Sequence, residues 1–172
     1  MKRGETMLDI EMKFNNIIVS NVEKKDLPQI HEWMELEGKF VYEESNLNEL
    51  NERFLESYIS EGEFFLKINN NNELIGIIKG RLEFKNPNEA WIWFFYINDK
   101  YRVTSLSNNI INALISQFYQ KYGIDIFFTR VIKNDSENIR FWRNMGFNII
   151  RIVKDFYNIN DEYIDMLIMK KI

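Results

Sequence analysis

Short continuous apolar runs alternate along the chain with segments whose apolar residues follow helical spacing. The clearest unit spans residues 90–147. Its apolar run at 91–97 is rich in aromatic residues and too short to cross a bilayer, so it predicts a buried strand. After a polar turn, apolar residues four positions apart predict a helix that begins near Ser105. A second apolar run, at 124–132, predicts another strand, and the whole pattern predicts a right-handed parallel crossover.

The rest of the chain supplies further strands and helices around this unit. The predicted order is strand, two helices, three strands, helix, strand, helix and two strands, which indicates one mixed, mostly antiparallel sheet flanked by helices, in the α/β (α+β) class. The segments outside the central unit are predicted at 14–22, 24–37, 46–60, 63–68, 73–84, 147–156 and 162–171.

Turn and cap residues delimit several of these elements. Asp26 is expected to cap the first helix, and Gly38 to end it. Gly76 and Gly80, inside a predicted strand, indicate a bulge or a close backbone approach.

A short helix predicted after residue 134 carries its own start and stop signals. Asn134 is expected to cap it, with Glu137 completing a capping box. Gly146 suits a left-handed stop, and Phe147 supplies the apolar contact that follows such a stop.

Composition narrows the class of protein. The chain has 172 residues and a net charge of −4, so we expect one domain at 14–172 after a polar extension at 1–13, with no basic stripe for nucleic acid. No apolar run approaches the roughly 20 residues of a membrane span, and the N-terminus lacks the apolar core of a secretory signal, which favours the cytoplasm. With no cysteine and only His31 among the histidines, no disulfide, thiolate nucleophile or metal site is predicted.

Two segments of the central unit resemble the GNAT family of N-acetyltransferases, and the resemblance extends over about 14–172. The loop at 97–107 is similar to the family's pyrophosphate loop, Arg/Gln-x-x-Gly-x-Gly/Ala, with Arg102 in the first position. The segment 134–147 is similar to the family's closing helix, Asn-x-x-Ala-x-x-x-Tyr-x-x-x-Gly-Phe, in which Trp142 takes the place of the tyrosine.

The chain departs from the family patterns at several positions. The pyrophosphate loop is degenerate, because Ser105 and Ser107 stand where glycine is usual. Glycine lets the backbone approach a phosphate closely, whereas serine keeps the N–H donor and adds a hydroxyl. Trp142 replaces a tyrosine that protonates the leaving thiolate, and an indole N–H cannot be a general acid near neutral pH. Asn134 lies one residue further from Gly146 than the pattern has it.

The resemblance implies transfer of an acetyl group from acetyl-CoA, as co-substrate, to a primary amine of a small molecule or peptide. The pantetheine arm would lie along the strand at 91–97, and the pyrophosphate at the N-terminus of the next helix. The residues implied to bind acetyl-CoA are Phe95, Ile97, Arg102, Val103, Thr104, Ser105, Leu106, Ser107, Asn134, Asn138 and Trp142.

The resemblance leaves the general base open. Glu89 is the candidate, because it shares side-chain parity with Trp91 and Phe95 on the predicted strand; the alternative is an exposed turn residue. A chain of waters can replace a side-chain base in this chemistry. Tyr96 and Tyr157 are expected to pack in the core near the cleft.

Three functions remain open at this level. The first is an N-acetyltransferase, and the second is a catalytically silent member of the same fold that binds CoA or another ligand. The third is an unrelated α/β domain in which the motifs occur by chance. The paired C-terminal strands would also leave a sheet edge on which two copies could form a homodimer.

Overall fold

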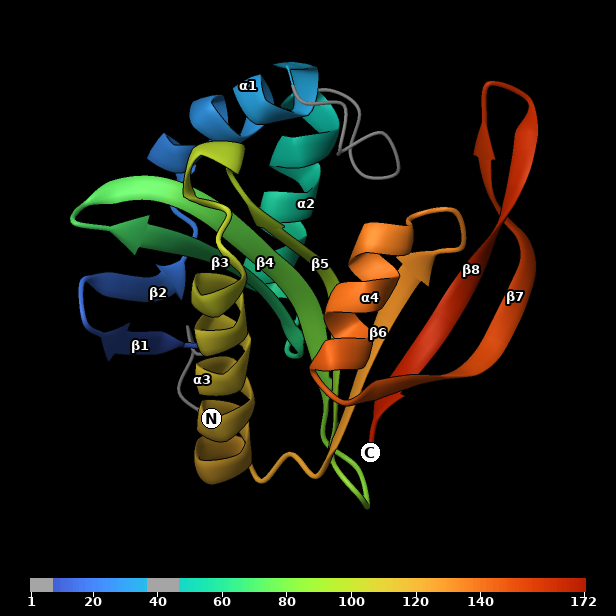
Figure 1. Ribbon diagram of the computed structural model, residues 1–172. Coiled ribbons are helices and arrows are strands. Elements are labelled where there is room, and N and C mark those ends of the chain that lie inside the picture. Colours follow the sequence, from blue (N-terminus) through green and yellow to red (C-terminus); the bar gives the residue numbers. More distant parts are fainter. Residues whose placement is uncertain (1–7, 37–46) are drawn as a thin grey trace.

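The computed structural model describes residues 8–36 and 47–172, and these form one sheet with helices on both faces (Figure 1). The sheet order is β1-β2-β3-β4-β5-β6-β8-β7. The strands are β1 (Glu11–Phe14), β2 (Ile17–Asn21), β3 (Glu63–Asn70), β4 (Glu73–Glu83), β5 (Glu89–Ile97), β6 (Ile126–Ile132), β7 (Phe147–Ile159) and β8 (Glu162–Lys171). The helices are α1 (Leu27–Leu36), α2 (Leu47–Ile59), α3 (Thr104–Tyr122) and α4 (Ser136–Asn144), with short 3₁₀ turns η1 (Lys24–Asp26) and η2 (Asp99–Tyr101).

The pairing of the strands confirms the predicted fold class. Only β5 and β6 run parallel, joined through α3, while each of the other pairs in the sheet is antiparallel. The crossover predicted from the aromatic run and the helix after it is therefore present. None of the helices in the described residues is long and apolar enough to cross a membrane.

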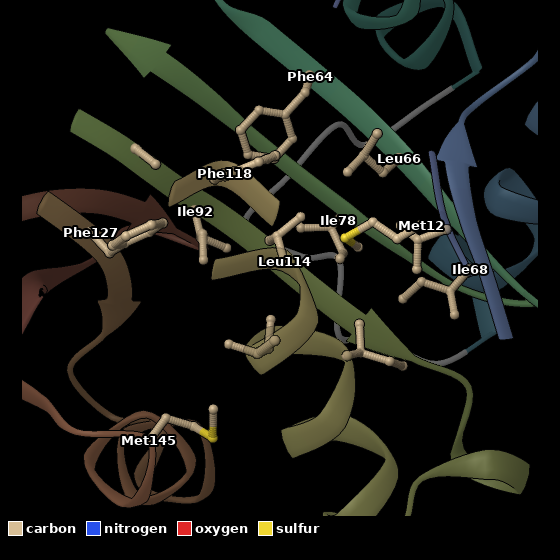
Figure 2. Packing of buried hydrophobic residues seen from close by; sticks show 14 of the residues in the cluster. Met12, Phe64, Leu66, Ile68, Ile78, Ile92, Leu114, Phe118, Phe127 and Met145 are labelled. Atoms are coloured by element: carbon tan, nitrogen blue, oxygen red, sulfur yellow. The ribbon is translucent and has the colours of Figure 1, made fainter. Parts of the chain in front are cut away.

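Two apolar clusters, one on each face, hold the helices to the sheet. On the first face α3 packs over the middle strands, and Figure 2 shows Leu114 and Phe118 lying close to Phe64 and Ile78. The rings of Phe64 and Phe118 meet edge-on at a centroid distance of 5.2 Å. On the second face, residues of α1 and α2 pack on Phe65, Ile77 and Tyr96 and other sheet residues. We call these the α3 face and the α2 face.

The N-terminal boundary differs from the prediction. Glu11–Phe14 forms β1, which pairs with β2 through a turn at Asn15, where φ is 51°. Ile10 and Met12 are 1% and 6% exposed and belong to the core on the α3 face. The expected extension at 1–13 is thus wrong for its described part, because the apolar residues at alternate positions bury themselves in the sheet.

The predicted start of the first helix is also shifted. Asp26 does not act as its N-cap; it is the last residue of η1, and its carboxylate accepts a hydrogen bond from the backbone N–H of Glu23 at 2.8 Å. The same carboxylate binds the buried Lys67 ammonium at 3.0 Å, so a tertiary ion pair engages the side chain expected to cap the helix. The stop predicted at Gly38 lies outside the described residues.

The signals around α4 are partly confirmed. Gly146 has the predicted left-handed φ of 90°. The cap, however, is Asp135, whose carboxylate accepts a hydrogen bond from the N–H of Asn138 at 3.1 Å. Asn134 is therefore not the cap, because α4 begins at Ser136, one residue later than predicted.

The glycines in β4 have the roles that their position indicates. A Cβ at Gly76 would collide with the carbonyl oxygen of Tyr96, and one at Gly80 with the carbonyl oxygen of Trp91. Both glycines therefore let β5 approach closely, and the pairing of β4 with β5 shifts beside Gly80.

Candidate active site

Strands β5 and β6 are paired at one end and separated at the other. Their ladder joins Glu89–Ile92 to Ile126–Thr129 and extends no further among the described residues. At its last position the Thr129 hydroxyl donates a hydrogen bond to the carbonyl of Ile92 at 3.0 Å. Beyond that point β5 continues along β4 to Ile97, and β6 continues along β8. The two strands therefore open into a V, with the parallel pairing at its apex.

A cavity of about 740 Å³ fills the opening of this V. Its walls come from residues 93–97 of β5, which we call the open half of this strand, and from the end of β6, the start of α3, the segment 134–144 and one residue of β7. The residues that line it are Trp93, Phe94, Phe95, Tyr96, Ile97, Arg102, Ser107, Asn108, Thr129, Arg130, Val131, Ile132, Asn134, Asp135, Glu137, Asn138, Arg140, Phe141, Trp142, Asn144 and Tyr157. The site is concave and combines aromatic with polar side chains, as ligand sites commonly do.

The loop from β5 to α3 is held by polar contacts at the mouth of the cavity. The Asn98 side chain accepts a hydrogen bond from the N–H of Lys100 at 3.0 Å, which shapes η2. The Arg102 guanidinium donates to the carbonyl of Ile97 at 2.8 Å and pairs with Asp99 at 2.7 Å. Arg102 therefore lines the cavity as a fixed cation that ties the loop to the strand before it.

The first turn of α3 presents backbone donors beside this loop. Ser107 donates its N–H to the carbonyl of Val103 at 3.1 Å and thereby begins the ladder of the helix. The N–H groups of Thr104, Ser105 and Leu106 precede that bond and have no acceptor within the helix. Together with the helix dipole they form a site suited to an anion.

The structure brings most of the predicted acetyl-CoA residues to the cavity but not all of them. Those that line it are Phe95, Ile97, Arg102, Ser107, Asn134, Asn138 and Trp142. Val103, Ser105 and Leu106 are not among the lining residues, and Val103 and Ser105 are exposed at the helix start. The side chain of Thr104 lies outside the described part of the structure. The backbone N–H groups of this segment remain suited to an anion.

Trp142 forms a buried aromatic wall. It is 2% exposed and lies edge-on to Phe141 at 5.1 Å and to Phe147 at 4.9 Å. Phe95 of β5 completes the group, at 6.4 Å from the Trp142 ring. The aromatic rings thus join α4 to the open half of β5 and fix one side of the cavity.

The predicted parity along β5 is broken by a bulge at Trp93. In the ladder with β4, Ile92 faces Gly80 and Phe94 faces Lys79, so Trp93 has no partner there. Ile92 and Phe95, three positions apart, consequently both pack on the α3 face. A bulge reverses the alternation of side chains, so a residue before it cannot share parity with Phe95 in the way expected.

Glu89 therefore lies away from the cavity. It stands at the paired end of β5 and is not among the lining residues. Its carboxylate binds the Lys85 ammonium at 3.1 Å and accepts a hydrogen bond from the Trp91 indole at 3.3 Å. Hydrogen bonds to Glu89 and Glu83 raise the pKa of Lys85 above its usual value. The contacts of Glu89 are those of a structural carboxylate.

Several lining residues were not predicted as site residues, and Tyr157, Arg130 and Asn108 are three of them. Tyr157 was expected to pack in the core, but it lies after a bulge in β7 and reaches the cavity. Arg130 stacks over the Trp93 ring at 5.6 Å, across the V. The Asn108 side-chain oxygen is buried without a hydrogen-bond partner among the described residues. No spacing rule links these positions, and the bulge before Tyr157 is visible only in the pairing of β7 with β8.

Comparison with known proteins gives one family for this fold and cleft. Residues 19–168 match the family model described as "Acetyltransferase (GNAT) domain". No curated protein sequence matches the chain.

Solved structures of low sequence identity share the fold. The N-terminal serine acetyltransferase of ribosomal protein L7/L12 from Salmonella typhimurium has a TM-score of 0.79 at 14% identity, covering 92% of this chain and 96% of that one. Spermidine N-acetyltransferase from Vibrio cholerae, solved with CoA and spermine, has a TM-score of 0.77 at 17% identity, covering 90% and 94%. The ribosomal-protein-S5-alanine acetyltransferase from Vibrio fischeri has a TM-score of 0.74 at 15% identity, covering 95% and 97%.

Proposed function

Because the chain belongs to the GNAT family of acetyltransferases, we propose that it transfers an acetyl group from acetyl-CoA to a primary amine. The observation that carries the proposal is the V between β5 and β6, whose cavity of about 740 Å³ opens at the N-terminus of α3. A strand edge without a ladder partner and a site suited to an anion lie together there. CoA matches this pair, because it combines an amide-bearing arm with a diphosphate.

The residues at the cleft fit the two parts of CoA. Backbone groups of β5 near Phe95 and Ile97 face a gap without a ladder partner, so the amides of the pantetheine arm can pair with them. The N–H groups at the start of α3 and the Arg102 guanidinium suit the diphosphate. Asn138 and Asn134 add polar groups along the α4 side of the cavity.

The proposed reaction is a direct transfer from the thioester to the amine. The neutral amine attacks the thioester carbon, the tetrahedral intermediate collapses, and the CoA thiolate leaves with the electron pair of the broken C–S bond. One proton leaves the amine and one joins the thiolate. A thiol of pKa about 8.5 is a good enough leaving group to need only water or the helix dipole for support.

The side chains of the cleft have corresponding roles. Trp142 acts as a wall for the pantetheine arm, since it is buried among rings and has no acidic proton near neutral pH. We propose that water carries the amine proton away, because Glu89 is outside the cavity. A second cavity of about 20 Å³, lined by Trp93, Arg130 and polar groups of α2, is large enough for one such water.

The acceptor is a primary amine of a small molecule or a peptide. The structural neighbours are named for an N-terminal serine, an alanine of ribosomal protein S5 and spermidine, which gives a natural panel of acceptors. Identity below 20% to each of them leaves the choice among these classes to experiment.

The second candidate function is a silent module that binds CoA. It is favoured by Ser105 and Ser107 in the pyrophosphate loop and by Trp142 in place of tyrosine. In this case the cleft would bind CoA, and no amine would be acetylated.

One experiment separates the two. Acetyl-CoA is titrated into the protein by calorimetry, and CoA release is then followed with spermidine and with peptides that begin with Ser or Ala. Binding with acetylation of a panel member supports the transferase, and binding without turnover supports the silent module. No binding at all would refute both.

A further inference from the structure

A bulge of two residues interrupts the pairing of β7 with β8 beside the cleft. Val153 pairs with Met166, and the next pair is Tyr157 with Ile164. Between these two pairs β7 advances by four residues and β8 by two, so β7 carries two extra residues. Bulges of this kind redirect a strand and are frequent near functional sites.

The carboxylate of Asp165, the β8 residue opposite the bulge, closes it. One carboxylate oxygen accepts a hydrogen bond from the backbone N–H of Asp155 at 2.9 Å. The other accepts hydrogen bonds from the ammonium groups of Lys154 at 3.1 Å and Lys133 at 3.2 Å. Asp155 has a left-handed φ of 52°, so the carboxylate stabilises a backbone turn that L-residues seldom adopt.

We call the contacts of the Asp165 carboxylate with Asp155, Lys154 and Lys133 the lock, and they join the hairpin of β7 and β8 to the end of β6. The backbone N–H of Lys133 donates to the carbonyl of Asp165 at 3.0 Å, just beyond the end of β6. Asp165 is only 9% exposed, whereas the side chains of Lys133 and Lys154 that bind it are 52% and 73% exposed. β6, β7 and β8 therefore meet at this one side chain.

Tyr157 is the first residue that re-enters the ladder after the bulge. An insertion of two residues preserves the alternation of side chains, so Tyr157 shares the face of Val153. That face is the α2 face, because the partners Met166 and Ile132 alternate with Val131, which packs on the α3 face. Tyr157 is also the residue of β7 that lines the cavity.

We infer that Asp165 is a positioning residue that fixes Tyr157 where the acceptor amine enters the cleft. The inference rests on the proposed function. The diphosphate site at the start of α3 assigns the cofactor to the α3 face, so the amine approaches the thioester from the α2 face. Tyr157 presents a phenol and a ring there, which can accept or donate a hydrogen bond and pack on an apolar segment.

The test separates positioning from simple stability. In Asp165→Ala, the KM for the acetylated amine of the panel is expected to rise about tenfold, with kcat and the CoA affinity changed by less than about twofold. Asp165→Asn keeps an oxygen for the Asp155 N–H and is expected to rescue most of the loss. Glu162→Ala, an exposed acid on the same strand, is the matched control and leaves all three constants unchanged.

A double-mutant cycle ties the effect to the tyrosine. If Asp165 acts through Tyr157, most of the KM effect of Asp165→Ala vanishes in a Tyr157→Ala background. Additive effects, or an equal loss of CoA affinity, would overturn the inference.

A second measurement holds even if no panel amine is acetylated, which would refute the proposed transferase and not the positioning. In NMR spectra of the CoA-bound protein, Asp165→Ala should shift the Tyr157 ring signals and abolish exchange protection of the Asp155 amide. Glu162→Ala should do neither. Unchanged Tyr157 signals in Asp165→Ala refute the lock.

Discussion

The two halves of β5 differ in their surroundings, because one is paired within the sheet and the other borders the cavity. Its first half, Glu89–Ile92, is paired on both sides and closed by β6. Its second half pairs with β4 alone and borders the cavity. The bulge at Trp93 separates them, and the Thr129 hydroxyl bound to the Ile92 carbonyl marks the same point on the other arm of the V.

The difference shows how one strand provides both rigidity and a binding edge. In the closed half, Ala90 and Ile92 are fully buried and interact through apolar contacts. In the open half the parallel ladder with β6 does not continue among the described residues, and the nearby structure is held by aromatic rings and ion pairs. A residue's place along β5 therefore decides whether it affects stability or binding.

Truncating the wall of the open half should give the largest effect. Trp142→Ala removes a buried indole that contacts Phe95 and Phe147, and about 4 kcal/mol of unfolding free energy should be lost. Turnover should fall further because the thioester is poorly placed. Trp142→Phe preserves a ring and should keep most of the activity. Urea denaturation and CoA release measure the two; equal turnover in both variants would contradict this role.

Truncation in the closed half should affect stability alone. Ile92→Ala empties a fully buried site under Phe127 and α3, which should cost about 3 kcal/mol. Under conditions where the variant remains folded, its affinity for CoA should match that of the unmutated protein. A loss of CoA affinity in the folded variant would mean that the two halves are coupled through the bulge.

A negative charge at the mouth should weaken CoA binding while slightly raising stability. Ser105→Asp places a carboxylate in the first turn of α3. In the protein without CoA, this negative charge interacts favourably with the helix dipole and should add about 0.5 kcal/mol to the free energy of unfolding. The same charge repels a diphosphate and should weaken CoA binding at least about tenfold, or roughly 1.4 kcal/mol. Calorimetry and thermal unfolding would reveal the opposite signs. Ser105→Asn is the uncharged control, and unchanged affinity in the Asp variant would locate the diphosphate elsewhere.

Most of the fold followed from apolar periodicity, and the errors have local causes. The predicted extension hid β1, although Leu8, Ile10, Met12 and Phe14 alternate with charged residues and so have the period-2 pattern of a strand. The sequence alone does not show that this strand pairs with β2 and packs under α3. Asp26 does not cap α1 as predicted, because its carboxylate binds Lys67 of β3, which is distant in the sequence.

The site was predictable where it depends on contiguous segments. The loop before α3 and the helix at 136–144 border the cavity, as the resemblance implied. Glu89 does not share the face of Phe95, because a bulge of one residue at Trp93 reverses the alternation of side chains, and it lies outside the cavity. Tyr157 was not predicted at the cavity, because a bulge of two residues extends β7 past the predicted end of its strand. Bulges depend on pairing between strands, so alternation along one strand does not predict them.

Low pH should destabilise the bulge of β7 that Asp165 holds before it destabilises the closed half of β5. Hydrogen bonds from the Asp155 backbone and from Lys154 and Lys133 lower the pKa of Asp165 from 3.8 to about 2. A lowered pKa contributes stability that is complete above about pH 4 and disappears as the pH falls through 2. Hydrogen exchange of residues 154–157 should therefore accelerate between pH 4 and 2, relative to Ile92. Asp165→Asn should remove that pH dependence, and a persistent one would assign it to another carboxylate.

The smallest effect is expected at Glu89, and it tests the boundary between the halves most directly. Glu89→Gln keeps the size of the side chain and can still accept the Trp91 indole hydrogen bond, while the ion pair with the exposed Lys85 is lost. Such pairs contribute less than about 1 kcal/mol. Because the closed half does not reach the cavity, kcat and the pH profile should match those of the unmutated protein. The comparison uses acetylation of the panel amine from pH 6 to 9, within the range where a general base would titrate as a limb of the profile. A limb that disappears in Glu89→Gln would make Glu89 the base after all, and would require the closed half of β5 to open during the reaction.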